Sequence, residues 1–252
     1  MADTLGIFNK FGNNLKSISR ETIGGANYLL VDNIQGNKMY FPRNPRNMSW
    51  GILFFGCWEP IETEWVKKVI RPGMTVIDVG CWIGYYSLLF AKLVGKEGLV
   101  YSFDIDNNGL ITLGNSSLVN NYNNIFCNNM LVNNSENKLD KLSFKNRLVD
   151  FIKIDVDGND LDVLFGAENY ISVNKDIIIM LEYCPYLWGS ISKIKDFFDF
   201  IDKHNFFVRK ISNYQFFDTN YVNLVEVFCE KYDNHEYQET LLLCRNKDKL
   251  YG

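Results

Sequence analysis

An apolar run that ends in glycine is followed by a second glycine four residues later. The run, MTVIDVG at residues 74–80, predicts a buried strand, and YYSLLFAKLVG at residues 85–95 predicts the helix after it. The turn between them holds Gly80 and Gly84. Such a turn brings backbone N–H groups and the positive end of a helix dipole to a ligand at the carboxyl edge of a sheet. We therefore expect residues 78–84 to form a nucleotide-type site.

The charge beside this turn indicates which ligand it binds. A nicotinamide dinucleotide favours the spacing G-x-G-x-x-G, which is absent here, and the carboxylate of Asp78 would repel a pyrophosphate. S-adenosylmethionine has no phosphate, and the ammonium and carboxylate of its methionine end suit an acid and free N–H groups. Asp104 ends the next strand-like run, where a carboxylate can accept hydrogen bonds from both ribose hydroxyls; Asp106 is the alternative if the register differs. These features predict S-adenosylmethionine as cofactor.

The residues that we assign to this cofactor lie in three stretches of the chain. They are Asp78, Gly80, Cys81, Trp82, Gly84, Tyr85, Asp104, Ile105, Asn129 and Asp155.

Acidic residues also follow two later strand-like runs. Asp155 and Asp157 end one run and Glu182 ends the next, so the parallel arrangement would bring all three to the edge that holds Gly80. Methyl transfer is an in-line displacement that needs alignment, and a positioned base accelerates attack by a weak nucleophile by ~10²–10⁴-fold. We expect these three acids to be catalytic. The alternatives are that Asp155 binds the cofactor, that Asp157 caps a helix, or that the three acids bind Mg²⁺, although we assign no metal ligand.

The second histidine of the chain is a further candidate base. His235 lies in the long segment before the last predicted strand and would reach the active face if the usual sheet order holds. A solvated loop histidine is the alternative. His204 lies where a predicted helix ends, a place that favours helix-end capping over catalysis.

Regular alternation of strands and helices must position these residues. We expect a mainly parallel seven-stranded sheet with helices on both faces, in a Rossmann-like α/β fold. A β-hairpin at about residues 26–42 forms an accessory segment, 1–55, ahead of the main domain, 56–252. The predicted strands are 74–80, 99–106, 124–131, 149–158, 176–183, 206–212 and 239–246; the predicted helices are 60–70, 85–95, 111–122, 161–171 and 193–205.

The composition of the chain limits its expected cellular location and its expected binding partners. The net charge of −4 and the pI near 5.3 disfavour general phosphate neutralisation, so we do not expect nucleic acid as a partner. The six cysteines form no Cys-x-x-Cys pair, which indicates reduced core thiols. The sequence shows no signal-peptide pattern at its start and no apolar run near the ~20 residues that a spanning helix needs. We therefore expect a cytoplasmic location and no membrane partner.

From Gly56 to about Glu182 the sequence resembles the FkbM family of S-adenosylmethionine-dependent methyltransferases. The stretches that carry this resemblance are GCWEPIET, RPGMTVIDVGCWIGYYSL, VYSFDID, DFIKIDVDGNDLDVLFGA and DIIIMLE. The most specific is similar to the family's D-F-I-K-I-D-x-E-G-x-E, with Asp157 and Asp160 in place of Glu. The turn departs from the family's D-V-G-A-N-I-G because it has Cys81 and Trp82; the indole would either stack on a ligand or block its approach.

The resemblance implies a class I methyltransferase that methylates oxygen, mostly hydroxyls of sugars or of sugar-bearing metabolites. The acceptor is then a small molecule or a glycan. A second interpretation is an RNA or nucleotide 2′-O-methyltransferase, because Lys153 shares a strand face with Asp155. A third is a non-catalytic binding module, because of Trp82 and the shortened Asp157.

Two further expectations concern the ends of the chain. The aromatic-rich residues 211–228 are expected to form a lid over the acceptor, with core packing as the alternative. The N-terminal hairpin offers an edge for pairing in a homodimer.

Overall fold

The computed structural model describes residues 18–42, 47–212, 215–219 and 238–250. The chain divides into two compact units: unit 1 is Met1–Gly73 with Cys81–Asn129, and unit 2 is Met74–Gly80 with Met130–Gly252. The chain passes from one unit to the other between Gly80 and Cys81, inside the predicted cofactor turn. The predicted division at residue 56 stays a prediction.

Unit 1 begins with an antiparallel sheet of three strands, β1 (Ile18–Ile23), β2 (Ala26–Ile34) and β3 (Asn37–Pro42). The predicted hairpin corresponds to β2 and β3. The strand β1 was not expected, because most of its side chains are exposed and give no apolar alternation. The tight turn before β2 consists of Gly24 and Gly25, both at positive φ, which two-residue hairpin loops require.

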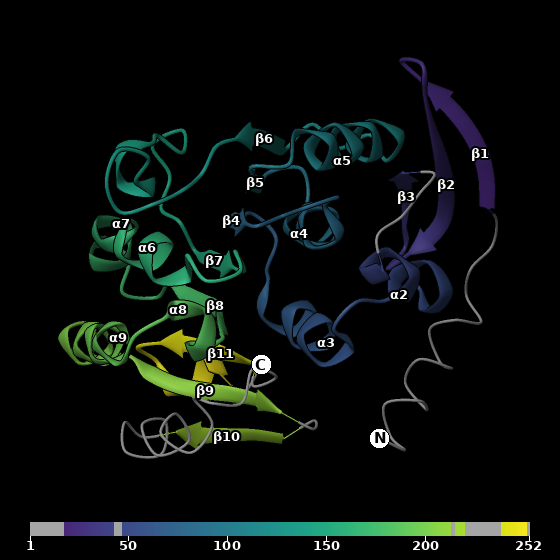
Figure 1. Cartoon of the computed structure of the whole chain (residues 1–252). Coiled ribbons are helices and arrows are strands. Elements are labelled where there is room, and N and C mark those ends of the chain that lie inside the picture. Colours follow the sequence, from purple (N-terminus) through teal and green to yellow (C-terminus); the bar gives the residue numbers. More distant parts are fainter. Residues whose placement is uncertain (1–17, 43–46, 213–214, 220–237, 251–252) are drawn as a thin grey trace. The chain divides into compact units, whose positions relative to one another are not determined.

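A helix covers the free edge of β3 (Figure 1). This helix, α5 (Asn107–Val119), and its C-cap supply side chains that replace a neighbouring strand. Asn120 accepts from the Lys38 N–H at 2.9 Å and donates to the Lys38 carbonyl at 2.6 Å, while the Tyr40 N–H donates to Ser116 Oγ at 3.0 Å. The backbone of β3 is therefore satisfied and blocked from pairing with another chain at this edge.

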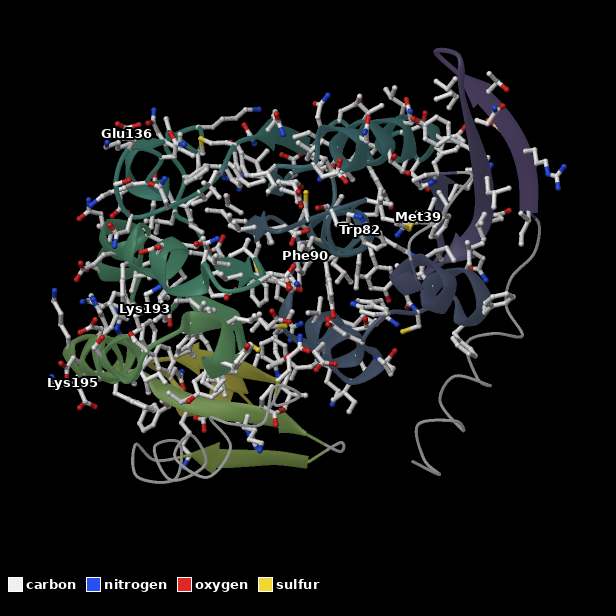
Figure 2. All side chains as sticks on the ribbon, in the orientation of Figure 1. Met39, Trp82, Phe90, Glu136, Lys193 and Lys195 are labelled. Carbon is white, nitrogen blue, oxygen red and sulfur yellow. The ribbon has the colours of Figure 1, made fainter. Side chains whose placement is uncertain are left out.

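The remaining elements of unit 1 include the helix that follows the glycine turn. They are α2 (Asn47–Phe55), α3 (Pro60–Val69), α4 (Tyr85–Val94), β5 (Leu99–Asp104) and β6 (Ile125–Asn129). The strands β5 and β6 pair in parallel, as expected from the helix between them. Met39 and Phe90 have no exposed surface and belong to the apolar core of this unit (Figure 2).

The described strands of unit 2 form a sheet in the order β10-β9-β11-β8-β7-β4. The bounds in unit 2 are β4 (Thr75–Val79), β7 (Phe151–Ile154), β8 (Ile178–Tyr183), β9 (Phe207–Ser212), β10 (Gln215–Thr219) and β11 (Glu239–Cys244). The first three pair in parallel, whereas β11 runs antiparallel to both β8 and β9. The parallel strands are almost wholly buried, which explains their continuous apolar sequence.

One described strand of unit 2 was not among the seven expected. The extra strand, β10, pairs antiparallel with β9 and includes Phe216 and Phe217. These two residues belong to the stretch expected as a lid; residues 215–219 form a strand, and the lid stays a prediction. The rest of the stretch beyond 219 lies outside the described residues.

The described part of unit 2 also contains four helices and two short 3-10 turns. They are α6 (Asp160–Phe165), α7 (Glu168–Val173), α8 (Pro185–Trp188), α9 (Ile191–His204), η1 (Leu139–Lys141) and η2 (Lys247–Leu250). The single helix expected at 161–171 is broken at Gly166, where a Cβ would lie 2.3 Å from the Asn133 carbonyl oxygen. Lys193 and Lys195 of α9 lie at the surface, as does Glu136 (Figure 2). No helix in the described part of the chain is long and apolar enough to span a membrane.

Candidate functional site

The glycine turn begins with a hydrogen bond to the neighbouring strand of unit 1. The Cys81 N–H donates to the Phe103 carbonyl of β5 at 3.2 Å, and the Gly84 N–H closes the turn on the Cys81 carbonyl at 2.8 Å. Trp82 between them has a left-handed backbone, with φ 46°. That conformation is rare for a bulky residue and stores strain of about 1–3 kcal/mol. The turn is therefore held in a shape that its sequence does not favour.

Asp104, at the end of β5, fixes this turn through both carboxylate oxygens. Its Oδ2 accepts from the Trp82 N–H and its Oδ1 from the Asp106 N–H, each at 2.7 Å. The amide of Asn129, at the end of β6, donates to the carbonyls of Asp104 and Ile105, both at 3.0 Å. The Ile105 side chain is 70% exposed. Each carboxylate oxygen of Asp104 retains a second lone pair for a ligand hydroxyl.

Two glycines let backbone and helix approach closely around the turn. Gly84 is the N-cap of α4 at φ 88°, and a Cβ there would lie 2.3 Å from Leu113 Cδ1. A Cβ on Gly109 would lie 2.8 Å from the Trp82 carbonyl oxygen. Both positions therefore need glycine, because any larger residue would collide with a neighbouring atom.

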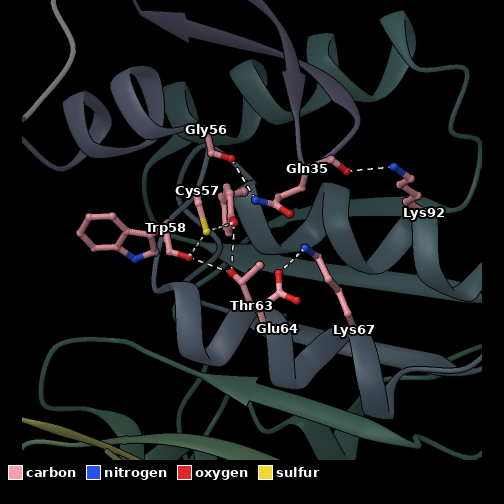
Figure 3. Close-up of polar contacts among 9 residues, drawn as sticks. Gln35, Gly56, Cys57, Trp58, Thr63, Glu64, Lys67 and Lys92 are labelled. Atoms are coloured by element: carbon pink, nitrogen blue, oxygen red, sulfur yellow. Dashed lines mark hydrogen bonds and ion pairs between the residues drawn. The ribbon is translucent and has the colours of Figure 1, made fainter. Parts of the chain in front are cut away.

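The segment before α3 is tied to the first turn of α4 (Figure 3). The Thr63 hydroxyl donates to the Trp58 carbonyl at 2.7 Å and lies 3.0 Å from Tyr85 Oη, which in turn lies 3.5 Å from Cys57 Sγ. Gln35 also donates to the Gly56 carbonyl at 3.0 Å. The Tyr85 side chain, expected at the cofactor, is directed into this buried cluster, and burial raises the pKa of its hydroxyl well above the usual value.

In unit 2, Gly80 allows β4 and the end of β7 to approach closely. Its φ is +83°, and a Cβ there would lie 1.7 Å from the Asp155 carbonyl oxygen. The Asp155 N–H donates to the Val79 carbonyl at 3.0 Å, which continues the ladder past the last residue of β7. Any side chain at residue 80 would separate the two strands and displace Asp155.

A buried lysine lies next to the acids of unit 2. Lys153 is 4% exposed and pairs with Asp155, with Nζ and Oδ2 2.5 Å apart. Asp78 of β4 is the register partner of Lys153 and is 1% exposed. Because register partners in a parallel sheet share a face, β4 and β7 together carry two acids and one base on one face. The ammonium compensates the charge of Asp155 in a site that excludes most water.

Asp160 is the best-buried acid of this cluster. Its side chain has no exposed surface and accepts from the Val156 N–H and the Gly158 N–H, both at 3.0 Å, and from Trp188 Nε1 at 3.4 Å. Burial raises its pKa, and the charge of Asp155 raises it further. These bonds hold the left-handed pair formed by Asp157 at φ 49° and Gly158 at φ 102°. Asp157 itself is exposed.

Glu182 lies at the end of β8 with its two oxygens in different settings. Oε1 accepts from the amide of Gln238, whereas Oε2 is buried and makes no hydrogen bond within the described residues. Burial, followed by the charges of Asp155 and Asp160, raises the pKa of Glu182 to about 8. The carboxyl group therefore exchanges its proton near neutral pH, as an efficient general base must.

The structure thus brings Asp155 and Glu182 together, as the sequence predicts, and adds three residues that the sequence analysis did not assign to the site. Asp160 was visible as the last acid of the motif, whereas nothing local marks Trp188 or Gln238. His235 lies outside the described residues. His204, in contrast, is 7% exposed and lies 3.0 Å from Glu168, away from the acids. Within the described ranges, no group of three or more His, Cys, Asp or Glu side chains is arranged to hold a metal ion.

Two methyltransferase family models match overlapping parts of the chain. The methyltransferase FkbM domain matches residues 132–208, and protein-L-isoaspartate(D-aspartate) O-methyltransferase matches residues 59–148. The FkbM match includes residues 155–160, called here the acid loop, and the second match includes the glycine turn and Asp104. The predicted resemblance to FkbM methyltransferases is confirmed.

Curated relatives match only a short stretch. Ribosomal RNA large subunit methyltransferase E of Acinetobacter baumannii is 47% identical over 45 residues, which are 18% of this chain and 21% of that protein. The same methyltransferase of Alkalilimnicola ehrlichii is 42% identical over 45 residues, 18% of this chain and 22% of its own. The match therefore spans about a fifth of the length of these relatives.

Solved methyltransferase structures are similar over most of the chain. The O-methyltransferase of Bacillus cereus in complex with SAH superposes with a TM-score of 0.53 at 12% identity, over 74% of this chain and 81% of that one. The ribosomal protein L11 methylase of Lactobacillus delbrueckii subsp. bulgaricus gives 0.50 at 14% identity, over 74% and 77%. At these identities the likeness shows the fold, which is the class I, Rossmann-like fold predicted from the sequence.

Proposed function

This chain has the class I methyltransferase fold and carries an FkbM methyltransferase domain at residues 132–208, and we propose that it transfers the methyl group of S-adenosylmethionine to a hydroxyl oxygen. The acceptor that we propose is a hydroxyl of a sugar or of a glycosylated metabolite. The observation that carries the proposal is the buried, unbonded Oε2 of Glu182 beside the Lys153–Asp155 pair.

The residues of unit 1 fit the adenosyl part of this cofactor. The free lone pairs of Asp104 suit the two ribose hydroxyls, and the exposed side chain of Ile105 offers an apolar surface for a purine ring. Gly84 is the N-cap of α4 and supplies no side-chain cap, so the first backbone N–H groups of this helix would donate to a carboxylate there. The cofactor, when bound, supplies an electrophilic methyl group on a sulfonium.

The acids of unit 2 fit the acceptor hydroxyl. As the oxygen lone pair forms the new O–C bond, the S–C bond breaks with its electrons passing to sulfur, and the hydroxyl proton must leave. The Glu182 carboxylate takes that proton, because its pKa near 8 leaves part of it ionised at neutral pH. Lys153 pairs with Asp155 and holds its side chain in place, so that Asp155 accepts a hydrogen bond from the acceptor and orients it.

A neutral acceptor suits the charge of this edge. Asp157 is exposed just past the end of β7, where its carboxylate would repel a phosphate, and Asp155 and Glu182 offer hydrogen-bond acceptors to a sugar hydroxyl. This is the reason for placing a sugar ahead of a nucleic acid.

The test is methyl transfer from labelled S-adenosylmethionine to a panel of neutral glycosides, with the Glu182→Gln variant as control. We expect label in the glycoside fraction with the natural chain, and at least a hundredfold less with Glu182→Gln. Micromolar binding of S-adenosylmethionine without transfer to any glycoside or RNA would favour the non-catalytic binding module instead.

A second candidate is an RNA 2′-O-methyltransferase. Two observations favour it: the Lys153–Asp155 pair, and the match to relatives named ribosomal RNA large subunit methyltransferase E. The net charge of −4 disfavours nucleic acid as the acceptor, whereas the 45-residue match to a ribosomal RNA methyltransferase favours it. Label in a ribosomal RNA fragment, with none in glycosides, would establish this candidate over the first.

A further inference from the structure

The short helix α8 borders the acid loop of unit 2 at van der Waals distance. A Cβ on Gly158 would lie 3.0 Å from the Leu187 carbonyl oxygen and 3.1 Å from Leu187 Cβ. Gly158 follows Asp157 directly, so the residue next to the acid lies against α8. The first residues of α8 therefore border the place where we propose that the acceptor binds.

The contact between α8 and the acid loop is fixed from both sides. On the loop side, Asp160 accepts from the Gly158 N–H and from Trp188 Nε1, so one carboxylate links the loop to the helix. On the core side, the Trp188 ring packs against Tyr183 and Phe197, with ring centroids 5.0 and 5.4 Å away. The position of α8 relative to the acids is thus set by buried groups.

Two apolar side chains of this fixed helix lie at the surface. Tyr186 is 40% exposed and Leu187 is 43% exposed, whereas Trp188 is 2% exposed. A protein gains no folding free energy from the exposed part of these side chains, and exposed apolar groups beside polar ones are typical of ligand sites. The neighbouring carboxylates limit the ligand to one that has hydroxyl groups and no negative charge.

We propose that Tyr186 and Leu187 form a platform against which the sugar ring of the acceptor packs, an inference that rests on the proposed function. A pyranose or furanose ring has apolar C–H groups on its faces and hydroxyls around its rim. The faces pack on the tyrosine ring and the leucine, while the rim hydroxyls donate to the carboxylates of Asp155 and Asp157. The platform supplies affinity for the acceptor, while Asp155 orients it and Glu182 takes the proton.

The test measures equilibrium binding of neutral methyl glycosides to the full chain in the presence of S-adenosylhomocysteine. The variants are Tyr186→Ala and Leu187→Ala, and the matched control is Phe207→Ala. Phe207 is 48% exposed on β9 of the same unit, and its register partner Cys244 places it at the opposite end of the strands from Tyr183. Thermal unfolding of all three variants shows whether they fold as the natural chain does.

We expect each α8 variant to weaken glycoside binding by at least fivefold, with S-adenosylhomocysteine binding unchanged, and the Phe207→Ala variant to bind as the natural chain does. In turnover assays the α8 variants raise KM for the acceptor and leave kcat within about twofold. Equal glycoside binding by the natural chain and both α8 variants would overturn the platform, as would absence of binding to any glycoside. Methyl transfer is scored separately, so a chain that methylates sugars without using α8 is distinguished from one that does not methylate them.

Discussion

At the scale of single residues, Trp82 places a bulky side chain where the backbone is left-handed. Its N–H holds Asp104, so the strained conformation serves the turn, and the indole is not needed for it. Glycine and asparagine adopt this conformation readily, whereas a β-branched residue does not. We expect Trp82→Gly and Trp82→Asn to bind S-adenosylmethionine within threefold of the natural chain, and Trp82→Val to bind at least tenfold more weakly, by titration calorimetry. Loss of binding in Trp82→Gly would instead assign the contact to the indole.

Glu182 makes a prediction about pH. A general base acts only when it is deprotonated, so the rate should rise as the pH rises through the pKa of this group, about 8. We expect kcat/KM for the acceptor to increase about tenfold per pH unit below pH 8 and to level off above it. In Glu182→Gln the remaining activity should lack this inflection. An unchanged profile in the variant would assign the proton transfer to another group.

Glu182 also affects stability, in the opposite direction. Its folded pKa lies above the ordinary value of 4.5, so the folded state holds the proton more tightly than the unfolded state between pH 4.5 and about 8. The stability that this group contributes is present below that window and is lost as the pH rises through it. The same burial that prepares the base therefore opposes folding at the pH where the base works.

At the scale of elements, the approach of β4 and β7 depends on one glycine. Gly80 and Gly73 have almost the same φ, +83° and +85°, but a Cβ would meet the Asp155 carbonyl oxygen at 1.7 Å in the first and nothing within 4 Å in the second. We expect Gly73→Ala to lower the free energy of unfolding by about 1 kcal/mol through backbone strain alone. Gly80→Ala should lower it by about 3 kcal/mol or more, because backbone must also move. Urea unfolding compares the two, and equal losses would show that β4 and β7 adjust without strain.

The elements differ in how far the sequence predicts them. The strand, turn and helix from 74 to 95 follow from local pattern alone, because a buried parallel strand is continuously apolar. The approach of Asp155 and Glu182 follows from it, since parallel strands end at one edge. In contrast, α8 has four residues, too few to show helical periodicity. The side chain of Tyr85 was assigned from its place in the chain, and its direction depends on Cys57 and Thr63, which no local pattern reveals.

Contacts between distant strands account for the rest of what the sequence did not show. Gln238 reaches Glu182 because β11 pairs with β8, with Thr240 opposite Glu182. This pairing joins the last predicted strand to the fifth, and a single sequence does not specify it. The sequence therefore predicts the position of the acid, whereas the environment that raises the pKa of Glu182 depends on how the strands pair.

At the scale of the whole molecule, charge decides between the two acceptors that we propose. The chain has a net charge of −4, and its candidate acceptor residues are carboxylates. A protein that binds single-stranded RNA through Z phosphates releases counterions, and log K falls with log salt with a slope of about −0.7Z. A neutral sugar releases none. The salt dependence of acceptor binding therefore reports the acceptor class.

We expect KM for the glycoside acceptor to change by less than twofold between 50 and 300 mM NaCl, because no phosphate is contacted. A ribosomal RNA fragment should bind weakly at both salt concentrations. The Asp157→Asn variant removes one exposed negative charge from the acceptor edge, so it should leave the salt dependence of glycoside KM flat while strengthening RNA binding slightly. The order of the two candidates would be reversed by two results together: a slope of −2 or steeper for log K of RNA binding against log salt concentration, and label transfer to that RNA. They would also mean that the basic side chains that contact phosphate outweigh the acids at the ends of β7 and β8.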